Sequence, residues 1–328
     1  MYNLITIGDI VIDTHVHIDN ASIACTLKNK PCQLCLDYAS KIPISDSFQS
    51  LGGNAANVAV GATKLGLKSA IISSIGDDSN GNLAIEELQK YGINTEYIIR
   101  EVKKQTRYSV VLTFQGERTI LSYHGKRQYK LPNKMPGVEI VYFTGLSAGY
   151  EKLQSQFLKW KANHPSVTLA YNPGTYQVTN TLDKVKEMVK NTDILIVNLQ
   201  EAERILETTL KEVKRVAALI HGLLNMGAKE VVITDADRGA CVGNIDEIWQ
   251  MTSFPVEVVA KVGAGDAFSS GYISARQKGF NQPQALRWGI ANSSGVITKV
   301  GAQNGLLNTK QINQMLAKYQ DIKPKLIF

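Results

Sequence analysis

Short apolar runs rich in β-forming residues alternate with segments of helical periodicity along most of this 328-residue chain. A strand that is apolar throughout is buried on both faces, as in a parallel sheet whose crossover helices cover both sides. In residues 211–226, apolar side chains recur at helical spacing and Gly227 follows as a stop. The alternation predicts an α/β fold with a parallel central sheet flanked by helices. The strands expected in that sheet are Leu4–Ile7, Ser69–Ser74, Ile140–Phe143, Val167–Tyr171, Ile194–Val197 and Val231–Thr234.

Two regions interrupt this alternation. Residues 107–123 alternate like two strands around a turn at Gln115, which predicts an antiparallel hairpin. Residues 14–50 are long, polar and cysteine-bearing, and we expect an edge or cover there rather than a sheet strand. No repeat or Gly/Ser-rich linker divides the chain. We therefore expect a single α/β domain over residues 1–328, with a small β-rich lid from parts of 14–50 and 100–125.

The charge balance restricts the partners of the chain. Lysine and arginine number 36 against 29 acidic residues, and this excess of +7 is scattered, which favours a soluble protein that meets anionic small molecules. Nucleic-acid binding is not expected, because aromatic residues make up only 7% and no zinc-finger, cold-shock or basic-helix pattern occurs. No membrane span is expected either, since the apolar stretches fall short of roughly 20 residues. Without a basic leader in residues 1–12, the expected location is cytoplasmic.

Three of the four cysteines, Cys25, Cys32 and Cys35, lie close together, with His15 and His17 upstream. Cys-x-x-Cys is a usual half of a zinc site, so a structural metal is one interpretation. The alternative is a pair of buried thiols that bind nothing, because the second half of the zinc site is ill-formed. Four cysteines in so long a chain do not indicate a disulfide scaffold, and a reducing compartment is expected.

The segment Val262–Phe268, with the sequence Val-Gly-Ala-Gly-Asp-Ala-Phe, is the most informative about chemistry. Its glycines open a helix, where converging backbone N–H groups and the helix dipole attract an anion. An aspartate beside such a site repels a phosphate, but it can accept the proton of a hydroxyl that attacks a phosphoryl group. The competing interpretation is that Asp266 only caps the helix.

A second glycine-rich segment, Leu51–Ala59, also opens a helix. Its small residues allow close backbone approach, and the amides of Asn54 and Asn57 can hydrogen-bond the hydroxyls of a polyol. Capping and tight helix packing are the alternative explanation, and Asn57 is less well placed than Asn54 to cap.

These two segments, in this order and this far apart, resemble the ribokinase or PfkB family of carbohydrate and nucleoside kinases. The resemblance implies a ribokinase-like fold and transfer of the γ-phosphoryl group of ATP to a hydroxyl. It covers most of the chain and extends to Ile7–Ile10 with Asp13, Ile75–Asp78 with Gly81, Gly116–Thr119, Asn198–Glu201 and Val300–Ala302.

The resemblance also implies roles for individual residues. Asp266 would be the catalytic base, and the amides of Gly263, Ala264 and Gly265 would bind the transferring phosphoryl group. Three residues would hold sugar hydroxyls, and four would serve Mg²⁺ or ATP. The sugar residues are Asp13, Gly53 and Asn57; Asn198 and Glu201 would organise Mg²⁺ and phosphates, Thr234 would begin the nucleotide-binding turn, and Asn292 would line the adenine pocket. Taken singly, Asp13, Asn198 and Asn292 also fit structural roles as a loop cap, a strand end and a surface amide.

The chain departs from the family pattern at two places. Family members activated by potassium use oxygen ligands ahead of the glycines, but Ala260 and Val262 have no side-chain oxygen and Lys261 adds a positive charge. We therefore predict activity that does not depend on monovalent cations. Ala236 stands where the nucleotide turn usually has glycine, and alanine is strained there if the position needs a positive φ.

Three functional alternatives remain at this point. A sugar acceptor is favoured over a nucleoside, because Asp13 and Gly52–Asn54 offer groups that can hydrogen-bond the hydroxyls of a sugar. A non-catalytic binding or regulatory protein on the kinase scaffold is the alternative from another class, but the retained Asp266 argues against it. A Rossmann dehydrogenase lacks its Gly-x-Gly-x-x-Gly segment after the first strand. The resemblance also implies a possible homodimer that pairs through the lid.

Overall fold

A computed structural model describes residues 1–25, 32–123, 125–208 and 215–328 of the chain. Its main sheet has ten strands in the order β16-β15-β14-β13-β12-β11-β10-β1-β6-β7. From β13 to β7 all pairings are parallel, which confirms the predicted central sheet, while β14 to β16 add an antiparallel edge. The bounds are β1 Tyr2–Ile7, β6 Ser69–Gly76, β7 Ile98–Glu101, β10 Val138–Phe143, β11 Thr168–Tyr171, β12 Ile194–Asn198, β13 Glu230–Thr234, β14 Ala240–Gly243, β15 Ile248–Met251 and β16 Lys325–Leu326.

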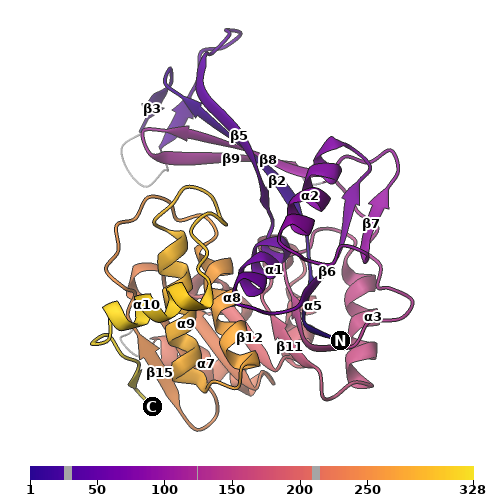
Figure 1. The fold of residues 1–328 in the computed structure, drawn as a ribbon, viewed down its shortest axis with the longest axis vertical. Helices are drawn as coiled ribbons and strands as arrows, with labels where there is room; N and C mark the ends of the chain where they lie inside the picture. The colour runs from indigo at the N-terminus through magenta and orange to yellow at the C-terminus, as the bar shows by residue number, and fades with distance from the viewer. Residues whose placement is uncertain (26–31, 124, 209–214) are drawn as a thin grey trace.

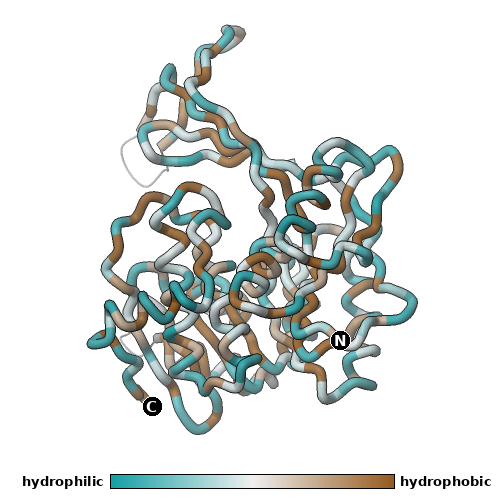
Figure 2. Tube along the Cα trace, in the orientation of Figure 1, coloured by the Kyte–Doolittle hydropathy of each residue, from teal (hydrophilic) through white to brown (hydrophobic). Residues whose placement is uncertain are grey.

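Helices cover both faces of this sheet (Figure 1). In β10, Ile140 and Tyr142 belong to an apolar cluster that includes residues of α1, α8, α9 and α10, whereas Val141 and Phe143 belong to one that includes residues of α3 to α7. Both faces of the strand are therefore apolar, as its sequence predicts, and the brown segments of Figure 2 run through these strands. The helices are α1 Asn54–Lys64, α2 Ser79–Lys90, α3 Glu151–Ala162, α4 Thr175–Asn180, α5 Leu182–Val189, α6 Leu199–Ile205, α7 Arg215–Asn225, α8 Ala264–Gln277, α9 Gln282–Val296 and α10 Thr309–Lys318.

The helix expected over residues 211–226 is confirmed from Arg215 to Asn225 as α7; residues 211–214 lie outside the described part of the chain. Among the helices described, none is both long enough and apolar enough to cross a membrane.

A separate small sheet, with strand order β5-β2-β8-β9, projects from the main body as a lid (Figure 1). Its strands are β2 Val11–Ile18, β5 Ile44–Gly52, β8 Arg107–Phe114 and β9 Glu117–Tyr123. The hairpin predicted around Gln115 is confirmed by the antiparallel pairing of β8 with β9. The prediction for residues 14–50 is half right: this region stays out of the main sheet, but it covers the molecule with strands of its own.

The cysteine-bearing part of the lid contains the short strands β3 (Ser22–Ala24) and β4 (Gln33–Cys35). Cys25 and Cys32 form a disulfide, and Cys35 is a free thiol. The zinc interpretation is therefore wrong for this structure, because the disulfide occupies a sulfur of the Cys-x-x-Cys pair. No group of three potential metal ligands occurs among the described residues. The expectation of reduced thiols is also not met for this pair.

Candidate active site

The amino terminus of α8 carries the glycine-rich segment. Gly263 precedes the helix with φ 78°, and a Cβ atom added there would lie 2.6 Å from Cα of Ala302, so only glycine fits. Gly265 is exposed and has open space where a Cβ would stand. The N–H groups of Gly265 and Asp266 lie in the first helical turn, where no carbonyl one turn back can accept them. This helix end therefore presents backbone donors that suit an anion.

Asp266 stands in the same helical turn and is half-buried. Its Oδ2 accepts a hydrogen bond of 2.8 Å from Nδ2 of Asn57 in α1. Burial raises the pKa of Asp266 to about 6 from its ordinary 3.8, and the hydrogen bond from Asn57 opposes part of that rise. A carboxyl group with such a pKa is mostly ionised at neutral pH and is basic enough to accept a proton from a hydroxyl.

Asp13 lies on the lid strand β2, where it is paired with Ser50 of β5 and Ser109 of β8. The chain approaches it closely, because a Cβ atom at Gly52 would lie 2.4 Å from Oδ2 of Asp13. Burial raises the pKa of Asp13, against the lowering effect of a hydrogen bond with Ser109. The carboxyl group and two serine hydroxyls thus share one face of the lid and can bind hydroxyl groups of a ligand.

The turn between β5 and α1 connects Asp13 with Asp266. Gly53 has φ 91°, and a Cβ there would lie 2.5 Å from the carbonyl oxygen of Asp9, so a side chain is excluded. Asn57 follows one turn into α1, and its backbone N–H donates to the carbonyl of Gly53 at 2.9 Å. The end of β5 thus lies against the lid carboxyl at Gly52, and the first turn of α1 hydrogen-bonds the α8 carboxyl through Asn57.

Asn198 and Glu201 form a reciprocal capping box at the start of α6, directly after β12. Oδ1 of Asn198 accepts from the N–H of Glu201, and Oε2 of Glu201 accepts from the N–H of Asn198, both at 2.9 Å. Burial raises the pKa of Glu201 to about 7, and the nearby charge of Asp266 adds to the rise. Thr234 ends the neighbouring strand β13 and pairs with Asn198. These side chains therefore lie at the carboxyl edge of the sheet, where α/β proteins bind ligands.

Two predicted site residues are bonded within the protein. Asn57 is only 5% exposed, and its amide donates to Asp266 and accepts from Nε2 of Gln303 at 2.9 Å, so its polar atoms are engaged by protein groups in this structure. Asn292 is fully buried, donates to the carbonyl of Ala267 and to Ser270, and accepts from the N–H of Leu307. Its amide ties α8 to α9 and the following loop, which leaves no exposed atom for adenine.

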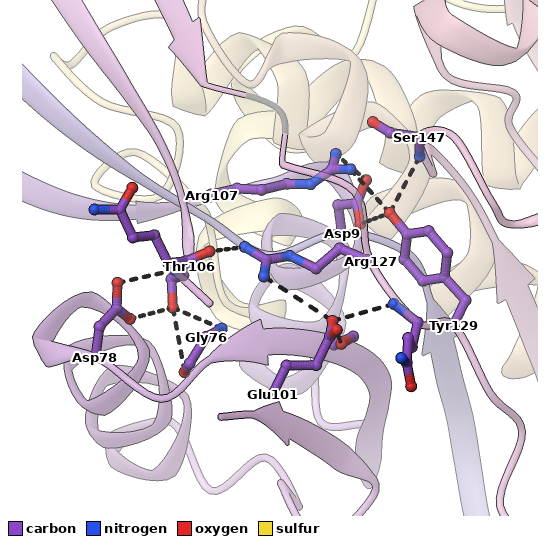
Figure 3. A network of polar contacts seen from close by, with 12 residues as sticks. Asp9, Gly76, Asp78, Glu101, Thr106, Arg107, Arg127, Tyr129 and Ser147 are labelled. Atoms are coloured by element: carbon purple, nitrogen blue, oxygen red, sulfur yellow. Dashed lines mark hydrogen bonds and ion pairs between the residues drawn. The ribbon is translucent and has the colours of Figure 1, made fainter. Parts of the chain in front are cut away.

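A buried network at the base of the lid was not anticipated (Figure 3). Arg107, the first residue of β8, makes an ion pair with Asp9, and both side chains are almost fully buried. Tyr129 donates to Oδ1 of Asp9 at 2.7 Å and accepts from Arg107 at 2.9 Å. Loss of one partner from such a pair leaves a buried charge and destabilises a fold strongly. The network therefore fixes the lid to the loop after β1.

Ala236 and Ala260 mark the two places where the sequence departs from the pattern of the family that it resembles. Ala236 has φ 47° in the turn Ala236–Arg238 after β13, so the position does require a positive φ and alanine is strained there. Ala260 is buried, and its N–H donates to the carbonyl of Ile297.

A cavity of about 540 Å³ lies elsewhere, at the amino ends of β10 to β13. It is lined in part by Thr168, Ile194 and Glu230, which begin strands β11, β12 and β13. The carboxyl-edge residues described above do not line it. Four of its charged lining residues pair with one another, Glu230 with Arg276 and Asp193 with Lys229.

A family model described as pfkB family carbohydrate kinase matches residues 19–310. The chain belongs to the PfkB family. The resemblance noted in the sequence is thus confirmed, and with it an ATP-dependent phosphotransferase that uses an alcohol group as acceptor.

Relatives in the PfkB family differ in acceptor. An ATP-dependent 6-phosphofructokinase of Thermoanaerobacterium thermosaccharolyticum is 26% identical over 96% of this chain and 94% of its own. A nucleoside kinase of Methanothermobacter thermautotrophicus is 26% identical over 79% of this chain and 82% of its own. This chain is therefore a sugar or nucleoside kinase of the PfkB family.

Solved structures confirm the ribokinase-like fold. The Arabidopsis thaliana ribokinase complexed with ribose and ATP has a TM-score of 0.80 and 20% identity, covering 96% of this chain and 98% of that one. An E. coli protein in complex with ATP and Mg²⁺ has a TM-score of 0.79 and 20% identity, covering 97% and 100%.

Proposed function

We propose that this PfkB kinase transfers the γ-phosphoryl group of ATP to a hydroxyl group of a small sugar, with Asp266 as general base. The observation that supports the proposal best is the position of the Asp266 carboxyl in the same helical turn as the unpaired N–H groups of α8. A proton acceptor and donors for phosphoryl oxygens are thus adjacent, which in-line phosphoryl transfer requires.

In the proposed reaction, Asp266 accepts the proton of the acceptor hydroxyl. The oxygen of that hydroxyl forms a bond to the γ-phosphorus at the same time. The bond from that phosphorus to the bridging oxygen breaks, and ADP leaves with the bond electrons. The amides at Gly263 and Gly265 stabilise the negative charge of the transferring group, and the amide of Ala264, which donates to the carbonyl of Lys261 at 3.4 Å here, would join them on leaving that carbonyl. The acceptor would be held by Asp13 and by the backbone at Gly53.

Mg²⁺ supplies charge neutralisation on the phosphates when it is bound with ATP. Glu201 fits this role, because Oε2 is engaged by the capping box while Oε1 has no hydrogen bond within the described chain. Mg²⁺ retains several waters and takes few protein ligands, so a single carboxylate with Asn198 nearby is a sufficient site. We assign Thr234 to the nucleotide side of this site.

The hydroxyl-binding face of the lid supports a sugar as acceptor. Asp13, Ser50 and Ser109 are cross-strand neighbours and offer a carboxylate and two hydroxyls to a polyol. The relative that phosphorylates 6-phosphofructose makes phosphorylated sugars a part of this class worth testing.

A nucleoside is the second candidate, on a specific observation. Two residues beyond Asp13 on the same face, His15 stacks on Phe48 with centroids 4.4 Å apart, and Val111 and the half-exposed Ile120 complete that row. Phe48 and Ile120, the more accessible members of this row, can hold a base, whereas His15 and Val111 are buried. The row combines residues from four strands, so no single stretch of sequence indicates it.

A panel of sugars, sugar phosphates and nucleosides assayed for ADP release tests these proposals. Acceptor-dependent ADP release with a sugar supports the first, and release with nucleosides alone supports the second. A chain that binds ATP but releases no ADP with any acceptor would contradict both and favour a non-catalytic role.

The homodimer implied by the family is a further proposal, supported by exposed apolar residues on the opposite face of the lid. Leu121 is 55% exposed and Tyr123 39%. Light scattering should give twice the 36.0 kDa of one chain, and L121E should shift the mass to that of the monomer. A monomeric wild type would contradict this proposal.

A further inference from the structure

Asp266 is the end of a chain of amide groups that begins at a backbone carbonyl. Nε2 of Gln303 donates to the carbonyl oxygen of Leu51 at 3.1 Å and to Oδ1 of Asn57 at 2.9 Å. Nδ2 of Asn57 donates in turn to Oδ2 of Asp266 at 2.8 Å. Gln303 and Asn57 are 8% and 5% exposed, so water has little access to either amide.

The order of donors in this chain is determined by its first member. An amide side chain has nearly the same shape in both orientations, so Asn57 alone could turn either its NH₂ or its oxygen toward Asp266. A backbone carbonyl can only accept, and the carbonyl of Leu51 therefore requires the NH₂ group of Gln303 to face it. The same NH₂ group meets Oδ1 of Asn57, which leaves Nδ2 of Asn57 for the carboxylate.

We propose that Gln303 is a positioning residue for catalysis, which acts through Asn57 to keep an N–H donor directed at Oδ2 of Asp266. This role rests on the proposed function of Asp266 as base. It also separates the two oxygens of the carboxylate. Oδ2 is held by Asn57, whereas Oδ1 has no hydrogen bond within the described chain and is left for the acceptor hydroxyl.

The electrostatic surroundings explain why the donor matters. Two other titratable groups face Asp266, the carboxyl of Glu201 and the phenol of Tyr142, and neither is a cation. Burial disfavours the ionised form of Asp266, and the N–H of Asn57 is the contact that favours it. If Asn57 turned its oxygen toward Asp266, the carboxylate would meet a second acceptor and would hold its proton to higher pH.

Two near-isosteric variants break the chain in different ways. Q303E places acceptors opposite both the Leu51 carbonyl and Oδ1 of Asn57, which favours rotation of the Asn57 amide. Q303M removes both hydrogen bonds and nearly preserves the volume. Q154L is the matched control, because Gln154 is also fully buried and donates to a backbone carbonyl, that of Lys184, but in α3 and α5.

The direct measurement is a ¹³C NMR titration of the Asp266 carboxyl in the free protein, assigned by its absence in D266N. We expect its midpoint to rise by about one pH unit or more in Q303E and Q303M and to stay in place in Q154L. In the kinase assay, the acid limb of kcat should shift upward by the same amount. For a shift of one unit, turnover should fall about fivefold at the original midpoint and recover at high pH, with KM for ATP unchanged.

The outcomes are distinguishable from failure of the proposed function. An Asp266 titration that is the same in both Gln303 variants as in the wild type would overturn the proposal, as would equal loss of turnover at every pH. If neither variant folds, Gln303 is a structural residue and the proposal is also overturned. A wild type that releases no ADP contradicts only the base role of Asp266, since the titration needs no activity.

Discussion

Nδ2 of Asn57 donates a 2.8 Å hydrogen bond to Oδ2 of Asp266, although the two residues are 209 positions apart in the chain. The contact joins the amino termini of α1 and α8, the two glycine-opened helices of the sequence. Burial raises the pKa of the Asp266 carboxyl and the hydrogen bond from Asn57 lowers it, and burial has the larger effect.

Activity should depend on two carboxyl groups at slightly acid pH. The pKa of Asp266 is raised to about 6 and that of Glu201 to about 7, and protonation of Asp266 removes the base. We expect kcat to fall as pH decreases from 8 to 5. If both groups must be ionised, the slope of log kcat against pH on the acid side should be greater than the slope for loss of a single proton. In E201Q that slope should be the slope for a single proton. A flat profile over this range would contradict the assignment.

The same carboxyl group should lower stability at neutral pH. Its folded-state pKa, about 6, is above the ordinary 3.8, so its contribution favours folding at low pH and is lost as pH rises through 6. D266N should therefore become more stable than the wild type by up to about 3 kcal/mol between pH 4 and pH 7. Urea unfolding of both proteins across this range measures the difference. A difference that does not change with pH would count against the raised pKa.

Relief of the strained turn should stabilise the protein. Ala236 has φ 47°, and glycine there removes about 1–2 kcal/mol of left-handed strain at a cost of roughly 0.4–1 kcal/mol in chain entropy. A236G should raise the free energy of unfolding by about 0.5–1 kcal/mol. Ala39 also has a positive φ, 59°, but lies in the lid, so A39G is the control. If the turn contacts ATP, KM for ATP will change in A236G and not in A39G.

Potassium should not activate the enzyme. Ala260 and Val262 supply no side-chain oxygen, and the N–H of Ala260 is occupied by the carbonyl of Ile297. Turnover with potassium should equal turnover with a tetraalkylammonium salt at the same ionic strength. Strong activation by potassium would show that other oxygens form a cation site.

The sequence predicts the parts of this molecule that depend on local pattern. Continuous apolar runs such as Ile140–Phe143 predict buried parallel strands, because helices on both faces of the sheet need them. The glycines around Asp266 predict a helix start that suits an anion. The antiparallel strands β14 to β16 are missed because they are short and gain their stability from the sheet edge to which they add.

The parts that sequence pattern misses depend on distant partners. Asn57 and Asn292 are amides whose hydrogen-bond partners come from other helices and loops, so the residue type alone cannot separate ligand binding from structural bonding. Gln303 belongs to no recognised motif, and only its position beside Asn57 indicates a role. The ion pair of Arg107 with Asp9 likewise joins segments 98 residues apart.

The most direct test of the account is the turnover of D266N, with D321N at an exposed remote aspartate as control. We predict that D266N binds ATP as the wild type does but loses about 10²–10⁴-fold in kcat, because the amide that replaces the carboxylate cannot accept the hydroxyl proton. D321N should be unaffected. Near-normal turnover by folded D266N would contradict the central claim that Asp266 is the base.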